Sequence, residues 1–182
     1  MTIFNRYLSR YEESREETFS LQEYLDLCKK GPAAYASAAE RLLLAIGEPE
    51  MVDTRNDTRL SRIFQNKVLK IYPAFQEFHG MEDAIEQIVS YLKHAAQGLE
   101  EKKQILYLLG PVGGGKSSLA ERLKQLMERI PFYAIEGSPV FESPLGLFNP
   151  DEDGQILEDD YGVPRRYLRH IMSPWAAKRL RE

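Results

Sequence analysis

A glycine-rich loop stands near the middle of the chain, where residues 110–118 read GPVGGGKSS. Five apolar residues, ILYLL at 105–109, lead directly into this loop, and the helix-forming stretch SLAERLKQLMERI follows at 118–130. Glycine loses more backbone freedom on folding than any other residue, so four glycines within six positions are costly to order. A loop of this composition between an apolar run and a helical stretch indicates that the backbone itself has a function.

The loop completes the pattern G-x-x-x-x-G-K-[ST], which binds phosphate. Its glycines allow successive N–H groups to point at phosphate oxygens, and the following helix directs its positive N-terminal dipole at the same anion. We expect Lys116, the catalytic candidate, to contact the β- and γ-phosphates and Ser117 to coordinate Mg²⁺. Ser118 also suits a role in capping or packing the first helical turn. The predicted phosphate-binding residues are Gly110, Pro111, Val112, Gly113, Gly114, Gly115, Lys116, Ser117 and Ser118.

The segments around the loop predict an α/β fold of the P-loop NTPase class, with a parallel sheet at its centre. The motif requires a buried strand before the loop and a helix after it, and the sequence offers 105–109 and 117–130. FYAIEG at 132–137 reads as a further strand. Before the loop, residues 80–98 read as one amphipathic helix between two glycines, with Met81, Ile85, Ile88, Val89 and Leu92 on one face.

The acidic residue that a nucleotide-hydrolysing site requires is not evident. That residue ends a second buried strand and holds the metal ion. FYAIE, ending at Glu136, lies only one short helix beyond Lys116, and QILEDD at 155–160 has just two apolar residues before its acids. Because 66 residues follow Lys116 (182 − 116), we expect the sheet and the site to be incomplete here. We also expect this chain alone to turn over little or no ATP.

The first part of the chain reads as a small helical module. Apolar and aromatic residues at 4, 7, 8 and 11 form a helical stripe. Ser20 and Gly31 suit the two ends of one helix, and the next helix would begin at Pro32 and end at Gly47. The stretch 47–59 is polar and rich in turn formers. The predicted domains are therefore a helical module at 1–55 and a P-loop domain at 56–182. Toward the C-terminus, 138–154 reads as loop, and a last helix is expected near Pro164.

Composition and charge exclude several classes of function. A net charge of −4 argues against a strongly basic nucleic-acid binder. The longest apolar runs are about five residues, so we expect no membrane span. The N-terminus lacks the apolar core of a signal peptide. The one cysteine, Cys28, permits no internal disulfide and reads as a buried structural thiol, and a cytoplasmic protein is the simplest interpretation.

Four longer strings resemble the bacterial PrkA-type serine protein kinases. They are FHGMEDAIEQIVSYLKHAAQGLEEKKQILYLLGPVGGGKSSLAERLK at 78–124, SPLGLFNP at 143–150, YGVPRRYL at 161–168 and SPWAAKRL at 173–180. The resemblance implies an AAA+ type module that forms the N-terminal portion of a longer chain. It further implies ATP and Mg²⁺ as cofactors, protein substrates, a role in stress or starvation physiology, a cytoplasmic location, and a possible homo-oligomeric ring. No nucleic-acid or membrane partner is expected.

The resemblance also suggests an adenine pocket. In AAA+ modules a glycine and an apolar neighbour before the P-loop lie against the adenine ring. By that match the candidates are Phe78, Gly80 and Met81, although Met81 and Ile85 also suit an ordinary helix core.

Kinase activity rests on the resemblance alone, because no H-R-D or D-F-G motif of the eukaryotic kinases is present. An AAA+ motor that unfolds proteins or supports their ATP-dependent proteolysis remains an alternative. A small-molecule kinase complete in itself is disfavoured by the missing acidic strand.

Overall fold

The computed structural model describes residues 3–14, 17–56, 58–169 and 171–181. They form two compact units, one made of Met1–Tyr35 together with Tyr133–Glu182, and the other of Ala36–Phe132. We refer to them as the terminal unit and the central unit. A compact unit of this kind is not the same as a domain of the sequence. The domain boundary expected between residues 55 and 56 therefore stays a prediction.

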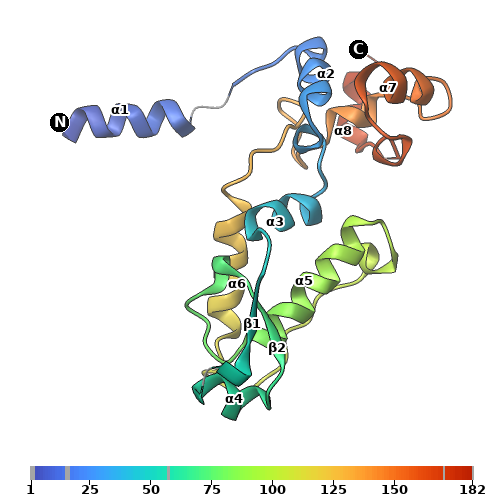
Figure 1. Ribbon diagram of the computed structural model, residues 1–182. Helices are drawn as coiled ribbons and strands as arrows, with labels where there is room; N and C mark the ends of the chain where they lie inside the picture. Colours follow the sequence, from blue (N-terminus) through green and yellow to red (C-terminus); the bar gives the residue numbers. More distant parts are fainter. Residues whose placement is uncertain (1–2, 15–16, 57, 170, 182) are drawn as a thin grey trace. The chain divides into compact units, whose positions relative to one another are not determined.

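The described part of the chain is mainly helical (Figure 1). Its α-helices are α1 (Ile3–Ser14), α2 (Leu21–Lys30), α3 (Ala38–Ile46), α4 (Thr58–Phe64), α5 (Glu82–Ala96), α6 (Lys116–Met127), α7 (Gly154–Tyr161) and α8 (Pro174–Arg179). Its strands are β1 (Glu50–Asp53) and β2 (Val68–Ile71). Short 3₁₀ helices are η1 (Pro32–Ala34), η2 (Thr54–Asn56), η3 (Pro73–Phe75), η4 (Glu100–Lys103), η5 (Pro144–Leu147) and η6 (Arg165–Tyr167). No helix among these described elements is both long and apolar enough to cross a membrane.

Local capping explains where the early helices begin and end. Ser20 and Glu23 form a reciprocal capping box at the start of α2, and Gly31 ends this helix, as the sequence predicted. Gly47 likewise ends α3. The helix expected to begin at Pro32 is divided, because Ser37 forms a second capping box with Glu40 and starts α3 only after η1.

The terminal unit has a core in which α2 packs with the segments around α7. Tyr24, Leu25 and Cys28 of α2 are buried there with Leu145, Leu157, Val163 and Leu168. Cys28 is buried, as the sequence predicted, and burial raises the pKa of its thiol. The apolar stripe predicted on α1 lies on a helix, but its side chains are exposed.

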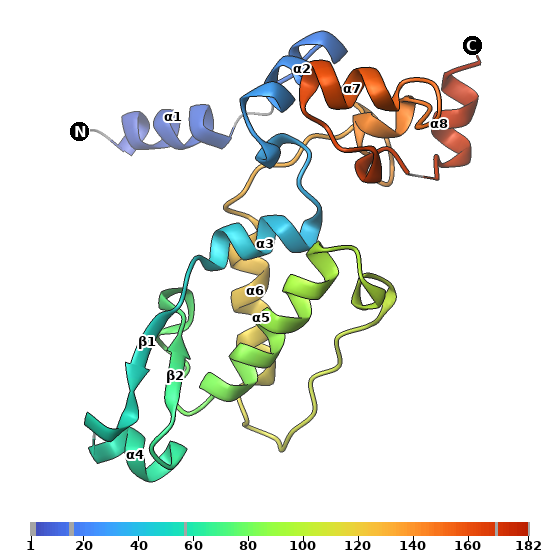
Figure 2. The same cartoon turned by 45° about the vertical axis from the view of Figure 1, so that its right-hand side comes forward.

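The central unit is built on three helices. Helix α3 packs against both α5 and α6, as Figures 1 and 2 show. Strands β1 and β2 pair antiparallel, with Glu50 opposite Ile71 and Asp53 opposite Val68, and β2 packs against α5. The predicted apolar face of α5 is confirmed, because its residues at 85, 88, 89 and 92 are buried in the core of this unit. The buried residues of that core are Leu42, Ile46, Tyr72, Phe75, Ile85, Ile88, Val89, Leu92, Leu119 and Leu126.

The two strands expected around the P-loop are not formed. Residues 105–109 run as an extended loop segment beside α5 (Figure 2), with Ile105 91% and Leu109 82% exposed. Leu108 alone of these five residues packs against the core. The segment 132–137 is also irregular. The expectation was wrong here because a strand needs a hydrogen-bonding neighbour, and β1 and β2, the strands of the described residues, pair with each other. The parallel sheet core is therefore not confirmed.

The C-terminal expectations also need correction. Residues 155–160, which the sequence offered only as two apolar residues before acids, lie within α7, and the left-handed Gly162 ends that helix. Arg165–Tyr167 forms only the 3₁₀ turn η6, and the last helix begins at Pro174 instead of Pro164. Ser173 caps that helix and Pro174 occupies its first turn, an arrangement that proline favours because it has no N–H to satisfy.

Glu142 joins distant segments of the terminal unit. Its carboxylate accepts hydrogen bonds from the hydroxyls of Ser138 (3.0 Å) and Ser173 (3.1 Å) and from the backbone N–H of Ser173. The N–H of Ser173, with smaller contributions from the two hydroxyls, lowers the pKa of Glu142 below its ordinary value of 4.5. The ionised form is thus favoured in the folded protein.

Glu142→Gln is expected to destabilise the terminal unit at pH 7. A carboxyl whose pKa is lowered by folding stabilises the protein above its unfolded pKa, and this stabilisation is lost as the pH falls through the folded pKa. The difference between wild type and variant should therefore shrink below about pH 4.5. Urea unfolding across pH 3 to 7 measures this difference, and the exposed Glu136→Gln serves as control. A difference that is constant over this range would contradict the assignment.

Candidate nucleotide-binding site

The glycine loop forms a tight turn in front of α6. The Gly114 N–H donates to the Pro111 carbonyl at 3.2 Å, which closes the turn. Gly113 and Gly115 have φ values of +79° and +74°, in the left-handed region that other residues rarely adopt. The two glycines are thus required by the backbone conformation of the loop.

Helix α6 begins at Lys116 with an uncapped N-terminus that faces the loop. Its N-cap residue is Gly115, and no side chain accepts a hydrogen bond from the first-turn N–H groups. These groups carry the positive end of the helix dipole, so they suit an anion. Leu119 and Leu126 are buried in the central core and hold the helix in place. The helix start is therefore both anchored and open to a ligand.

The Lys116 side chain folds back across the loop. Its ammonium Nζ donates to the carbonyls of Gly110 (2.8 Å) and Pro111 (2.5 Å). The positive charge is thereby held over the glycine turn. Ser117 and Ser118 follow in the first turn of α6 and are exposed. The positive charge, the uncapped helix start and the adjacent hydroxyl fit a Mg²⁺-bound phosphate chain.

Met81 connects the P-loop with the segment before α5. It occupies the N-cap position of α5 and packs partly buried against the central core. Its sulfur lies 3.0 Å from the point where a Cβ on Gly115 would stand. The structure therefore brings one adenine candidate into contact with the phosphate loop. It also leaves no room for a side chain at Gly115 unless Met81 moves.

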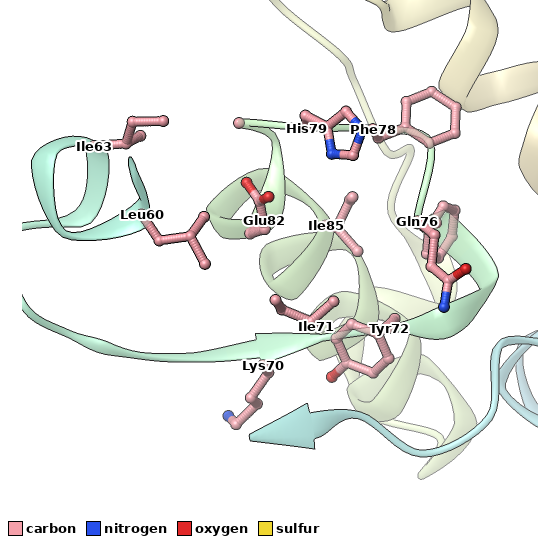
Figure 3. A pocket seen from close by; sticks show the side chains of 12 residues that line it. Leu60, Ile63, Lys70, Ile71, Tyr72, Gln76, Phe78, His79, Glu82 and Ile85 are labelled. Atoms are coloured by element: carbon pink, nitrogen blue, oxygen red, sulfur yellow. The ribbon is translucent and has the colours of Figure 1, made fainter. Parts of the chain in front are cut away.

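The other two adenine candidates, Phe78 and Gly80, line a cavity of about 270 Å³ beside the start of α5 (Figure 3). The full lining is Leu60, Ile63, Lys70, Ile71, Tyr72, Phe75, Gln76, Phe78, His79, Gly80, Glu82 and Ile85. Ile85 is 4% exposed and belongs to the core, as its position on the helix predicted. The roles of the three adenine candidates in nucleotide binding stay predictions.

Two acidic residues near this cavity differ in their partners. The Glu86 carboxylate binds the Lys70 ammonium at 2.5 Å, and this hydrogen bond raises the pKa of Lys70. In contrast, the buried Oε2 of Glu82 has no hydrogen-bond partner. Sequence reasoning did not find Glu82, because an acid in the first turn of a helix is a common feature and nothing in the sequence shows whether its oxygens are satisfied.

Neither of the two acidic segments considered in the sequence ends a strand in the part of the chain that the structure describes. Glu136 lies in a turn, and the acids of 155–160 lie on α7. Among the described residues, no group of three or more His, Cys, Asp or Glu side chains could hold a metal ion. Ser117 thus remains the one proposed Mg²⁺ ligand on this chain.

Comparisons with known proteins agree with the resemblance seen in the sequence. The family model described as the PrkA AAA domain matches residues 19–182. The chain is 68% identical over its whole length to the serine/threonine kinase YeaG of Escherichia coli strain K12. It is 31% identical, over 96% of its length, to the ATP-dependent protease PrkA of Bacillus subtilis strain 168.

The chain spans 29% of the length of the first of these relatives and 27% of the second. No solved structure matches it.

Proposed function

Because the chain belongs to the PrkA AAA domain family, we propose that it forms the ATP- and Mg²⁺-binding portion of a PrkA-type serine/threonine protein kinase. The observation that carries this proposal is the Lys116 ammonium held across a glycine turn at the uncapped start of α6. The protein-kinase part is supported by the printed name of the relative at 68% identity. In this proposal the substrates are proteins, phosphorylated in stress or starvation physiology.

Each predicted site residue has a place in this function. Lys116 leaves the carbonyls of Gly110 and Pro111 and binds the terminal phosphates, while the N–H groups of 113–118 surround the chain of phosphate oxygens. The Ser117 hydroxyl coordinates Mg²⁺. Phe78, Gly80 and Met81 enclose the adenine ring. ATP supplies the phosphoryl group that the complete enzyme transfers.

A second candidate function is an AAA+ motor for protein unfolding or ATP-dependent proteolysis. It is supported by the relative at 31% identity, which is named an ATP-dependent protease. Both functions use the same phosphate loop, so this site does not separate them. A cytoplasmic location, a homo-oligomeric ring, and the lack of nucleic-acid or membrane partners belong to the proposal in either case.

The test uses the full-length protein that contains this chain, with γ-labelled ATP and with casein as a general protein acceptor. Label on serine or threonine that disappears in Lys116→Ala supports the kinase. The motor is supported instead if casein is degraded while phosphate is released and no protein becomes labelled. This degradation should also be lost in Lys116→Ala. Absence of ATP binding by the wild type would overturn both functions.

A further inference from the structure

We propose that Tyr91 of α5 is a positioning residue for the phosphate loop, because its hydroxyl holds the segment through which the chain enters that loop. The inference rests on the proposed nucleotide-binding function and adds a residue that lies outside the P-loop pattern. The hydroxyl binds backbone groups before the loop. Tyr91 therefore acts through residues 104–109 and not on the nucleotide itself.

The weak support of the entering segment is the first reason. Residues 105–109 lead into the loop without pairing to β1 or β2, the strands of the described residues. Ile105, Tyr107 and Leu109 are largely exposed, and Leu108 packs against the core. Ordering an extended segment of this kind costs conformational entropy. The few points at which the segment is fixed therefore decide how well the loop is ordered.

The hydrogen bonds of Tyr91 are the second reason. Its hydroxyl shares one hydrogen between the backbone carbonyls of Glu101 (2.9 Å) and Gln104 (2.6 Å). The Gln104 N–H donates to the same Glu101 carbonyl at 3.1 Å and closes the turn around η4. The Tyr91 side chain is partly buried against the central core. Gln104 is thus tied to α5 immediately before the apolar run begins.

A second contact from α5 to this turn is weaker. His94 Nδ1 lies 3.0 Å from a carboxylate oxygen of Glu101, but the two side chains are 47% and 28% exposed. Exposed pairs contribute little, because water and salt compete for their charges. The Tyr91 hydroxyl, in contrast, belongs to a side chain packed on the core and binds backbone groups. We therefore assign the position of Gln104 to Tyr91.

Helix α5 also reaches the other side of the loop, which is the third reason. Met81, at the N-cap position of α5, contacts Gly115 through its sulfur. The chain leaves η4 near the end of α5 and returns to the start of α6 (Figure 2). One helix thus holds the chain at both ends of residues 105–114. A site that is ordered in only a fraction of the molecules binds its ligand more weakly by that fraction.

Tyr91→Phe tests the proposal, because it keeps the ring and removes only the hydroxyl. In the full-length protein that contains this chain, ATP affinity is measured by calorimetry with Mg²⁺. It should fall by about fivefold, the effect of one hydrogen bond. Amide hydrogen exchange at residues 104–115 should be faster in the unliganded variant and return to the wild-type rate with saturating ATP. Exchange in α5 should stay as in wild type.

Two matched controls should change ATP affinity by less than about twofold. Tyr107→Phe removes a hydroxyl from the run itself, where the side chain is 76% exposed. His94→Ala removes the exposed contact to Glu101 from the same helix.

The outcomes separate the inference from the proposed function. If Tyr91→Phe binds ATP like wild type while Lys116→Ala loses affinity, the inference is overturned and the proposed function stands. Faster exchange throughout α5 in Tyr91→Phe also overturns the inference, because Tyr91 would then support the helix core and not the loop. If wild type does not bind ATP, the proposed function fails and the inference fails with it.

Discussion

Lys116→Ala is expected to weaken ATP binding by about 100-fold, equivalent to about 2.7 kcal/mol. The ammonium is held over the glycine turn by the carbonyls of Gly110 and Pro111, and it is the positive side chain at the start of α6. Alanine removes the charge that would face the terminal phosphates, while the uncapped helix start remains. Residual binding should therefore be weak but measurable by calorimetry with ATP and Mg²⁺.

Lys124→Ala is the matched control for this prediction. Lys124 lies on the same helix, its side chain is 68% exposed, and it is 4.0 Å from Glu121. The Lys124→Ala substitution removes one positive charge from α6 without changing the loop. Exposed ion pairs contribute little, so ATP affinity should change less than about twofold. Unchanged affinity in Lys116→Ala would mean that this loop is not the phosphate site.

Leu126→Ala is expected to destabilise the central unit by about 3 kcal/mol. The Leu126 side chain is fully buried, and it anchors the far end of α6 in the core that α3 and α5 share. Truncation removes buried methyl groups and leaves a cavity in a close-packed region. Since α6 begins at the phosphate loop, ATP affinity should also fall where the variant is partly unfolded.

Urea unfolding, followed by far-UV circular dichroism, measures this loss, and Leu44→Ala is its control. Leu44 lies on α3 of the same unit but is 57% exposed, so its truncation should change the free energy of unfolding by less than about 0.5 kcal/mol. A loss below about 1 kcal/mol in Leu126→Ala would show that α6 is not held by this core.

Local features of the fold could be predicted from the sequence because they depend on neighbouring residues. Ser20 begins α2 through hydrogen bonds between side chain and backbone with Glu23, and Gly31 ends it through a backbone hydrogen bond to Cys28, all within three residues. The apolar face of α5 follows from the spacing of its side chains, and the helix after the loop follows from residues 118–130. The loop glycines were also identified by spacing, and Gly113 and Gly115 adopt the left-handed backbone that favours glycine.

Features that depend on distant partners could not be predicted in the same way. The apolar run 105–109 has the composition of a strand, but a strand forms only when another strand pairs with it. That the buried Oε2 of Glu82 has no hydrogen-bond partner is visible only in the folded structure. Likewise, the composition of 155–160 did not show that these residues form α7, which ends at Gly162.

The exposed run ILYLL has a consequence for handling the chain in solution. Its side chains are largely open to water, and its peptide groups lie outside the β1–β2 sheet. Five consecutive apolar residues without charge or proline can add to a like segment edge to edge. At high concentration, copies of this chain should thus adhere through residues 105–109, and dilution together with mild detergent should keep them apart.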